Sequence, residues 1–129
     1  MIEFKRKERD YRIEMKLLGS DYVVNVSPTS HVLLKQVQTL QDEARAMLKS
    51  LDSATVETIV DIVEAVLAKE KAVVDLLLPG AWEGFYDELK GDVLDLTELV
   101  AFVVAKVLQG ASTAKLAAVA PVEGNGEEV

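Results

Sequence analysis

The chain has 129 residues, half of them apolar, and a formal net charge of −8, which is enough length and apolar content for one domain with a substantial core. It contains no cysteine, so disulfides, thiolate chemistry and cysteine-based zinc sites are excluded. An acidic chain repels nucleic-acid phosphates, and the most apolar stretch, 93–108, is interrupted by charges and too short for a bilayer, so we expect a cytoplasmic protein without nucleic-acid or membrane partners.

The charge is unevenly distributed along the chain. Residues 1–50 hold nine Lys/Arg against seven Asp/Glu, whereas residues 51–129 hold five against fifteen. The basic residues cluster at the start of the chain: Lys5, Arg6, Lys7, Arg9 and Arg12. Because acidic residues are interspersed among them, we interpret this segment as a solvated end, with contact to an acidic partner as the alternative.

A β-hairpin is predicted at residues 11–26. Apolar side chains alternate with polar ones over 11–17 and again over 22–26. A two-residue Gly19-Ser20 turn would pair Leu17 with Tyr22 and Met15 with Val24, which places the apolar side chains of both strands on one face.

Helical patterns follow the hairpin. The Ser27-Pro28-Thr29-Ser30 segment is typical of a helix start, and a narrow apolar stripe then continues over about 30–50. Packing inside the chain is one reading of that stripe, and a coiled-coil contact with another copy is the other. A second helix is predicted from 53 to 69, after an Asp52-Ser53 cap. A straight continuation would bury Glu70 unpaired, so we predict a break near 69–71 and a separate helix over 71–78.

The remaining elements are two helices and a tail. Pro79-Gly80 ends the previous helix, residues 81–89 form a short one, and Gly91-Asp92 leads into a last helix over about 92–109. The expected fold is mostly α: an N-terminal β-hairpin followed by a bundle of three to five helices. Residues 1–109 form a single domain, and 110–129 form a flexible, disordered tail.

Catalytic chemistry is not visible in the sequence. His31 is the only histidine and lies in the first turn of a helix, without a second histidine or cysteine for a metal site. The scattered glycines form no phosphate-binding loop. Acidic pairs such as Glu57 with Asp61 are typical of a solvated face. We therefore expect a protein that is not an enzyme and has no catalytic, cofactor or metal site.

The last helix carries more apolar surface than a surface helix needs. Full burial of one Val or Leu side chain stabilises a protein by about 1.5–3 kcal/mol, and an exposed side chain loses this stabilisation. The simplest explanation is that a second copy or another protein buries this surface. The alternatives are that Phe102 is an isolated exposed aromatic and that Trp82 and Phe85 are core anchors. We predict a protein interface made of Phe102, Glu98, Lys106, Val103, Val107, Trp82 and Phe85.

The order of elements resembles that of a known family. A hairpin at 11–26, the aromatic corner Gly80-Ala-Trp-Glu-Gly-Phe-Tyr-Asp-Glu-Leu-Lys-Gly-Asp92 and the apolar start Val93-Leu-Asp-Leu-Thr-Glu-Leu-Val-Ala-Phe102 are similar to those of the tail assembly chaperones of long-tailed (siphovirus-type) bacteriophages. The resemblance covers 11–109 and its motifs are degenerate.

This resemblance implies a non-enzymatic chaperone that works in the cytoplasm of an infected bacterium. Such a protein coats the tape-measure protein, helps recruit tail-tube subunits and tends to form homo-oligomers. Many members also occur in a longer form made by ribosomal frameshifting. The alternative hypothesis is a self-assembling helical structural or adaptor protein. A third is a small hydrolase or regulatory enzyme, which would be indicated if His31→Ala abolished a measured activity.

Overall fold

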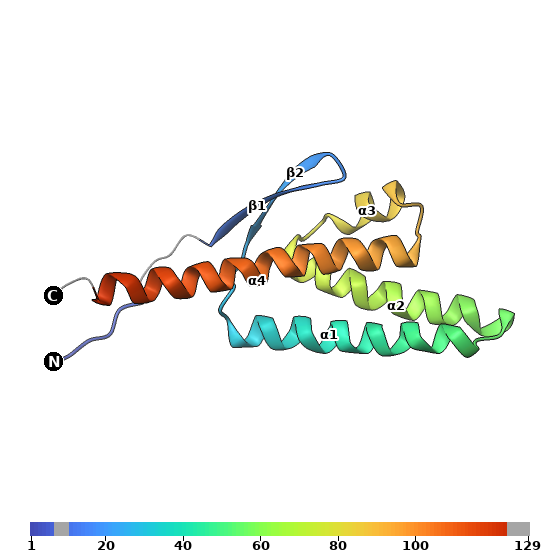
Figure 1. Cartoon of the computed structure of the whole chain (residues 1–129), viewed down its shortest axis with the longest axis horizontal. Helices are drawn as coiled ribbons and strands as arrows, with labels where there is room; N and C mark the ends of the chain where they lie inside the picture. Colours follow the sequence, from blue (N-terminus) through green and yellow to red (C-terminus); the bar gives the residue numbers. More distant parts are fainter. Residues whose placement is uncertain (7–10, 124–129) are drawn as a thin grey trace.

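The computed structural model describes residues 1–6 and 11–123, with side chains up to residue 110. This part of the chain contains an antiparallel β-hairpin and four α-helices, with a short 3₁₀ turn, η1, after the first helix (Figure 1). The elements are β1 (Arg12–Leu17), β2 (Ser20–Asn25), α1 (His31–Lys49), η1 (Ser50–Ser53), α2 (Val56–Leu77), α3 (Trp82–Glu88) and α4 (Val93–Glu123). The predicted class, mostly α with an N-terminal hairpin, is confirmed.

The central element of the fold is α2. Helices α1 and α2 form an antiparallel pair, and α4 packs along another side of α2. The hairpin and α3 lie on the side of α4 that faces away from α1 (Figure 1). In the described part of the chain, α1 and α4 touch each other at most marginally. Each therefore depends on α2 for its place in the fold.

The hairpin forms as predicted, but its turn lies one residue earlier. Leu18 and Gly19 make the turn, with positive φ of 52° and 84°, and Met15 pairs with Tyr22 instead of Val24. Positive φ at both turn positions matches the right-handed twist of the strands, which favours this turn. Because the pairing shifts by two residues, each side chain keeps its predicted face, and Met15 and Val24 are buried.

Helix α1 begins at the predicted cap. The Ser30 hydroxyl accepts a hydrogen bond from the Leu33 amide at 3.3 Å, which satisfies one of the free amides of the first turn. The most buried members of its apolar stripe are Val37 and Ala44, and α1 packs on α2 along its length. The stripe therefore packs inside the chain, which is the first of the two readings.

Helix α2 runs unbroken from Val56 to Leu77, so the predicted break near 69–71 is wrong and the two helices predicted there are one. The predicted Asp52-Ser53 cap is also wrong, because these residues lie in η1 and Thr55 is the cap residue of α2. Glu70 lies in its interior and is only 2% exposed. Burial raises the pKa of the Glu70 carboxyl, and the nearby Thr97 hydroxyl lowers it in part. A raised pKa favours the neutral carboxyl, which is far less costly to bury than a carboxylate. The helix buries Glu70 without a break.

The corner between α3 and α4 depends on Gly91. Its φ is 68°, its amide donates to the Tyr86 carbonyl at 2.9 Å, and a Cβ here would lie 2.9 Å from the Tyr86 ring. Only glycine fits this position without strain. The Asp92 carboxylate then accepts hydrogen bonds from the amides of Leu94 and Asp95, both at 3.0 Å, and caps α4 as predicted.

Helix α4 is longer than the sequence pattern indicated. It continues through Gly110 to Glu123 instead of ending near residue 109, because the small residues that follow Gly110 do not stop a helix as a glycine-proline pair does. The expected flexible tail, 110–129, thus includes a helical part, and its last six residues lie outside the described residues. The flexibility of this segment stays a prediction.

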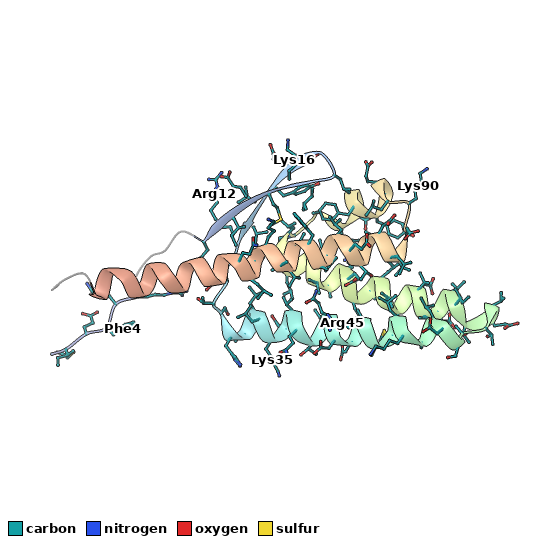
Figure 2. The ribbon with its side chains drawn as sticks, viewed as in Figure 1. Phe4, Arg12, Lys16, Lys35, Arg45 and Lys90 are labelled. Atoms are coloured by element: carbon teal, nitrogen blue, oxygen red, sulfur yellow. The ribbon has the colours of Figure 1, made fainter. Side chains whose placement is uncertain are left out.

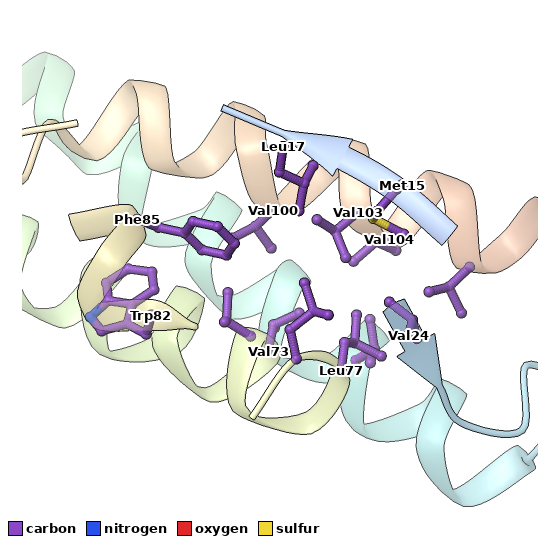
Figure 3. Packing of buried hydrophobic residues seen from close by; sticks show 14 of the residues in the cluster. Met15, Leu17, Val24, Val73, Leu77, Trp82, Phe85, Val100, Val103 and Val104 are labelled. Carbon is purple, nitrogen blue, oxygen red and sulfur yellow. The ribbon is translucent and has the colours of Figure 1, made fainter. Parts of the chain in front are cut away.

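The core lies where the hairpin, α2, α3 and α4 meet (Figure 3). Strand residues such as Leu17 and Val24 face helix residues such as Val73, Leu77 and Val103. This apolar cluster fixes α4 against α2 and the hairpin on one side only. Among the described residues, Leu94, Phe102 and Leu108 of α4 lie outside this cluster and are exposed.

Candidate partner-binding groove

An apolar groove runs between α1 and α4, over α2. Its volume is about 280 Å³. Leu77 of α2 lies at its base, and side chains of α1 and α4 form its two walls. The lining residues are Leu33, Leu34, Val37, Gln38, Gln41, Asp42, Leu77, Val104, Val107 and Leu108. We call this site the α1/α4 groove.

An exposed apolar strip on α4 continues the groove. Leu94 is 61% exposed and Leu108 is 50% exposed, and the exposed Ala101 and Ala105 lie between them. Separations of seven, four and three residues place these four side chains on one side of a helix. Leu108 belongs to both surfaces, so the groove adjoins the strip at this residue.

The rim of the groove is polar but weakly charged. Gln38 and Gln41 line it on the α1 side, and the Asp42 carboxylate is paired with Arg45 at 3.2 Å. Amide side chains can donate and accept hydrogen bonds to a partner without the cost of desolvating a charge. This rim suits the polar edge of an amphipathic helix.

Three of the sequence-predicted interface residues are on the outer face of α4. Phe102 is 44% exposed, and the Lys106 ammonium lies 5.3 Å from its ring centroid. Glu98 is exposed, one turn before Phe102. The Lys106 contact shields part of the ring, and these residues border the exposed strip on its outer edge.

The other four predicted interface residues are in the core of the chain. Val103 and Val107 are 2% and 3% exposed, and Trp82 and Phe85 are 6% and 1% exposed. The Phe85 ring packs against Tyr22 of the hairpin, with 5.2 Å between centroids. These residues therefore stabilise the fold. Val107 also lines the α1/α4 groove, whereas Val103, Trp82 and Phe85 do not. The burial of Trp82 and Phe85 agrees with the core-anchor alternative.

Sequence reasoning did not single out Leu34, Leu94, Ala101, Ala105 and Leu108 as surface residues. The signal was present, because the wide apolar arc of the last helix includes Leu94 and Leu108. Which part of that arc is covered depends on the docking of the hairpin, and the pattern of one helix does not specify it.

A second, shallower hollow lies on the other side of α1, between α1 and α2. Its volume is about 800 Å³, it is more open than the α1/α4 groove, and Val32, 69% exposed, is on its border. Its lining includes His31, Lys35 and Asp75. We regard the α1/α4 groove as the candidate site, because it is more enclosed and continues into an exposed apolar strip.

The described residues offer no cluster of side chains that could together bind a metal ion. They contain no group of three or more His, Asp or Glu side chains placed to hold a metal ion. Within the same residues, no helix has an apolar stretch long enough to cross a membrane.

The buried Glu70 is neighboured by Thr97, whose hydroxyl is itself buried and forms no hydrogen bond of good geometry in this part of the chain. This pair lies inside the packing of α2 and α4 rather than in the groove.

No protein-family model, curated protein or solved structure matches the chain.

Proposed function

We propose that this protein acts without catalysis, by holding an amphipathic helix of another protein in the α1/α4 groove. The observation that carries the proposal is the apolar groove together with the exposed α4 strip that adjoins it at Leu108. Helices α1, α2 and α4 occupy three positions of a bundle in which α1 and α4 are both packed on α2. A fourth helix laid between α1 and α4 would complete it.

Burial of the exposed α4 strip by a client helix would contribute substantial free energy to binding. Leu94 and Leu108 are each at least half exposed, and full burial of one such side chain is worth about 1.5–3 kcal/mol. Ordering and desolvation on association consume part of this gain. A client helix with leucine-sized side chains at i, i+3 or i+4 and i+7 could contact the strip and enter the groove.

For the client, we propose the tape-measure protein of a long-tailed phage, on the basis of the sequence resemblance. In this role the protein is a tail assembly chaperone that works in the bacterial cytoplasm and helps recruit tail-tube subunits. A tape-measure protein is a long helical chain with apolar stripes. The net charge of −8 would keep a coated client dispersed by repulsion.

The second candidate function is a self-assembling structural or adaptor protein. The same exposed α4 strip favours it, since a strip of this kind on another copy could cover it. In that case the protein has no separate client, and groove substitutions change only its own association state.

Co-expression with a candidate client tests the proposal. A very long reading frame for a helical protein should lie downstream of the gene, with a tail-tube gene upstream, and segments of that frame provide the client. We expect the wild-type protein to keep the client soluble and to co-purify with it. Leu34→Glu combined with Leu108→Glu should abolish both effects, because it places two charges in the groove.

Val32→Glu is the matched control. It introduces the same charge on α1, but on the side of the second hollow. We expect it to leave client binding unchanged. Equal client solubility with the wild type and with the groove variant would contradict the proposed function.

A further inference from the structure

Two exposed apolar patches lie at opposite ends of the molecule. The first, the lead, is the segment 1–6, in which Ile2 is 99% and Phe4 is 91% exposed. The second, the tip, is the start of α2, in which Val56 is 82% and Val60 is 60% exposed. Figure 2 labels Phe4 at one end of the long axis, and Figure 1 places the turn between α1 and α2 at the other.

The tip is apolar because α2 extends beyond α4. Ile59 lies on the side of α2 that is buried further along the helix, but it is itself 40% exposed. The start of α2 extends past the start of α4, so α4 does not cover the first turns of α2 (Figure 1). A surface that is packed further along the same helix is therefore bare at this end. Neither η1 nor the start of α2 buries Val56, Ile59 or Val60.

The charges beside the two patches are opposite. Lys5 and Arg6 follow Phe4 directly in the lead, where Glu3 is the only acid among the first six residues. At the tip, the exposed acids Glu57, Asp61 and Glu64 follow one edge of α2. Hydrogen bonds from its own backbone amide and from the Thr55 hydroxyl lower the pKa of Glu57. The tip is thus an apolar patch with an acidic border, and the lead an apolar pair with a basic border.

The spacing of the apolar side chains also agrees. In an extended segment, alternate side chains share a side and are about 6.6 Å apart along the chain. Val56 and Val60, one turn apart on a helix, are separated by about 6 Å along the axis. Ile2 and Phe4 can therefore lie beside Val56 and Val60 while Lys5 and Arg6 approach the acidic edge.

We propose that the lead of one copy binds the tip of a second copy, so that copies associate head to tail. The lead and the tip of one molecule are at opposite ends (Figures 1 and 2), whereas the tip of a second molecule presents the complementary charge and spacing. A contact between two different patches leaves one patch free at each end, so it continues into an open row or closes only as a ring. This contact does not use the α1/α4 groove. The further idea that a row of copies covers a long client rests on the proposed function.

Two variants, each with one of the two patches disabled, test this contact. Ile2→Asp with Phe4→Asp disables the lead, and Val56→Asp with Val60→Asp disables the tip; all four positions are at least 60% exposed, so circular dichroism should show an unchanged fold. In sedimentation experiments we expect the wild-type mass to rise with concentration beyond a dimer and to fall at high salt. Each variant alone should be monomeric at concentrations where the wild type assembles.

An equimolar mixture of the two variants gives the decisive result. The intact tip of the lead variant can bind the intact lead of the tip variant, so the mixture should form dimers and nothing larger. A wild-type protein that is monomeric throughout, assembly of either variant alone, or a mixture of folded monomers would each overturn the proposal. The groove variant Leu34→Glu with Leu108→Glu should still assemble. Loss of client binding in the groove variant therefore tests the proposed function, and loss of assembly in the lead and tip variants tests the head-to-tail contact.

Discussion

The Glu70 carboxyl of α2 and the Thr97 hydroxyl of α4 are buried next to each other in the interface of the two helices. Glu70 is 2% exposed, and Thr97 lowers a pKa that burial has raised. The pair places a titratable group inside the packing that holds α4 in position. Helix α4 also forms one wall of the α1/α4 groove.

The first prediction concerns the pH dependence of stability. The pKa of Glu70 in the folded state lies above its ordinary value of 4.5, so the folded state binds the proton more tightly than the unfolded state. The resulting stabilisation is fully present below pH 4.5 and is lost as the pH rises through the folded-state pKa. Each pKa unit corresponds to about 1.4 kcal/mol.

Glu70→Gln removes this titration. We expect the free energy of unfolding of the variant, relative to that of the wild type, to increase as the pH rises from 4.5 toward neutrality in urea titrations. Glu64→Gln, at an exposed position on the same helix, controls for the loss of a charge. A Glu70→Gln difference that does not change with pH would show that the carboxyl is not held in a buried site.

The second prediction concerns the contact between the hairpin and α4. A Cβ on Gly110 would lie 2.7 Å from Ile13 Cδ1, so Gly110→Leu should displace Ile13 and destabilise the fold by about 1–3 kcal/mol. Adding Ile13→Ala should restore part of the loss. Gly84→Leu is the control, since nothing lies within 4 Å of a Cβ there. Additive effects of the two substitutions in thermal unfolding would exclude this contact.

The third prediction concerns the start of α4. Asp92→Ala removes the acceptor of two amide hydrogen bonds and should lower the free energy of unfolding by about 1 kcal/mol, whereas Asp92→Ser should retain most of it. Chemical denaturation measures both variants. Equal stability of the alanine variant and the wild type would mean that α4 does not depend on this cap.

The fourth prediction separates the outer face of α4 from its core face. Phe102→Asp should change stability by no more than about 0.5 kcal/mol, because Phe102 is partly exposed. Val103→Asp should destabilise the fold by about 4 kcal/mol or more, because Val103 is 2% exposed and its replacement buries an unpaired charge. Unfolding of the Phe102→Asp variant at neutral pH would mean that the orientation of α4 is wrong.

The sequence was sufficient to predict the hairpin and the starts of α1 and α4. Alternation of apolar side chains identified the hairpin, and the caps at Ser30 and Asp92 identified two helix starts, because these signals are local and each requires only a few residues. The pairing register was not specified to the residue. Turns beginning at Leu18 or at Gly19 bury the same face, and only the turn dihedrals distinguish them.

The errors concern features that depend on tertiary contacts. The break predicted near Glu70 assumed a charged carboxylate, whereas its surroundings raise the pKa and favour the neutral form. Trp82 and Phe85 were assigned to an interface because aromatic residues near a corner suit either role. Both are buried, and Phe85 packs against Tyr22 of the hairpin. The α1/α4 groove requires three helices to be placed together, so its lining could not be selected from the pattern of any single helix.

The most direct test of the central claim, that the α1/α4 groove binds a client helix, uses the absence of cysteine from the chain. A polarity-sensitive fluorophore is attached to Gln38→Cys, in the groove, or to Gln36→Cys, on the other side of α1. Each labelled protein is titrated with an amphipathic helical segment of the candidate client. We expect a saturable blue shift at position 38 and none at position 36. No change at either position, or a shift at position 36 alone, would contradict the claim.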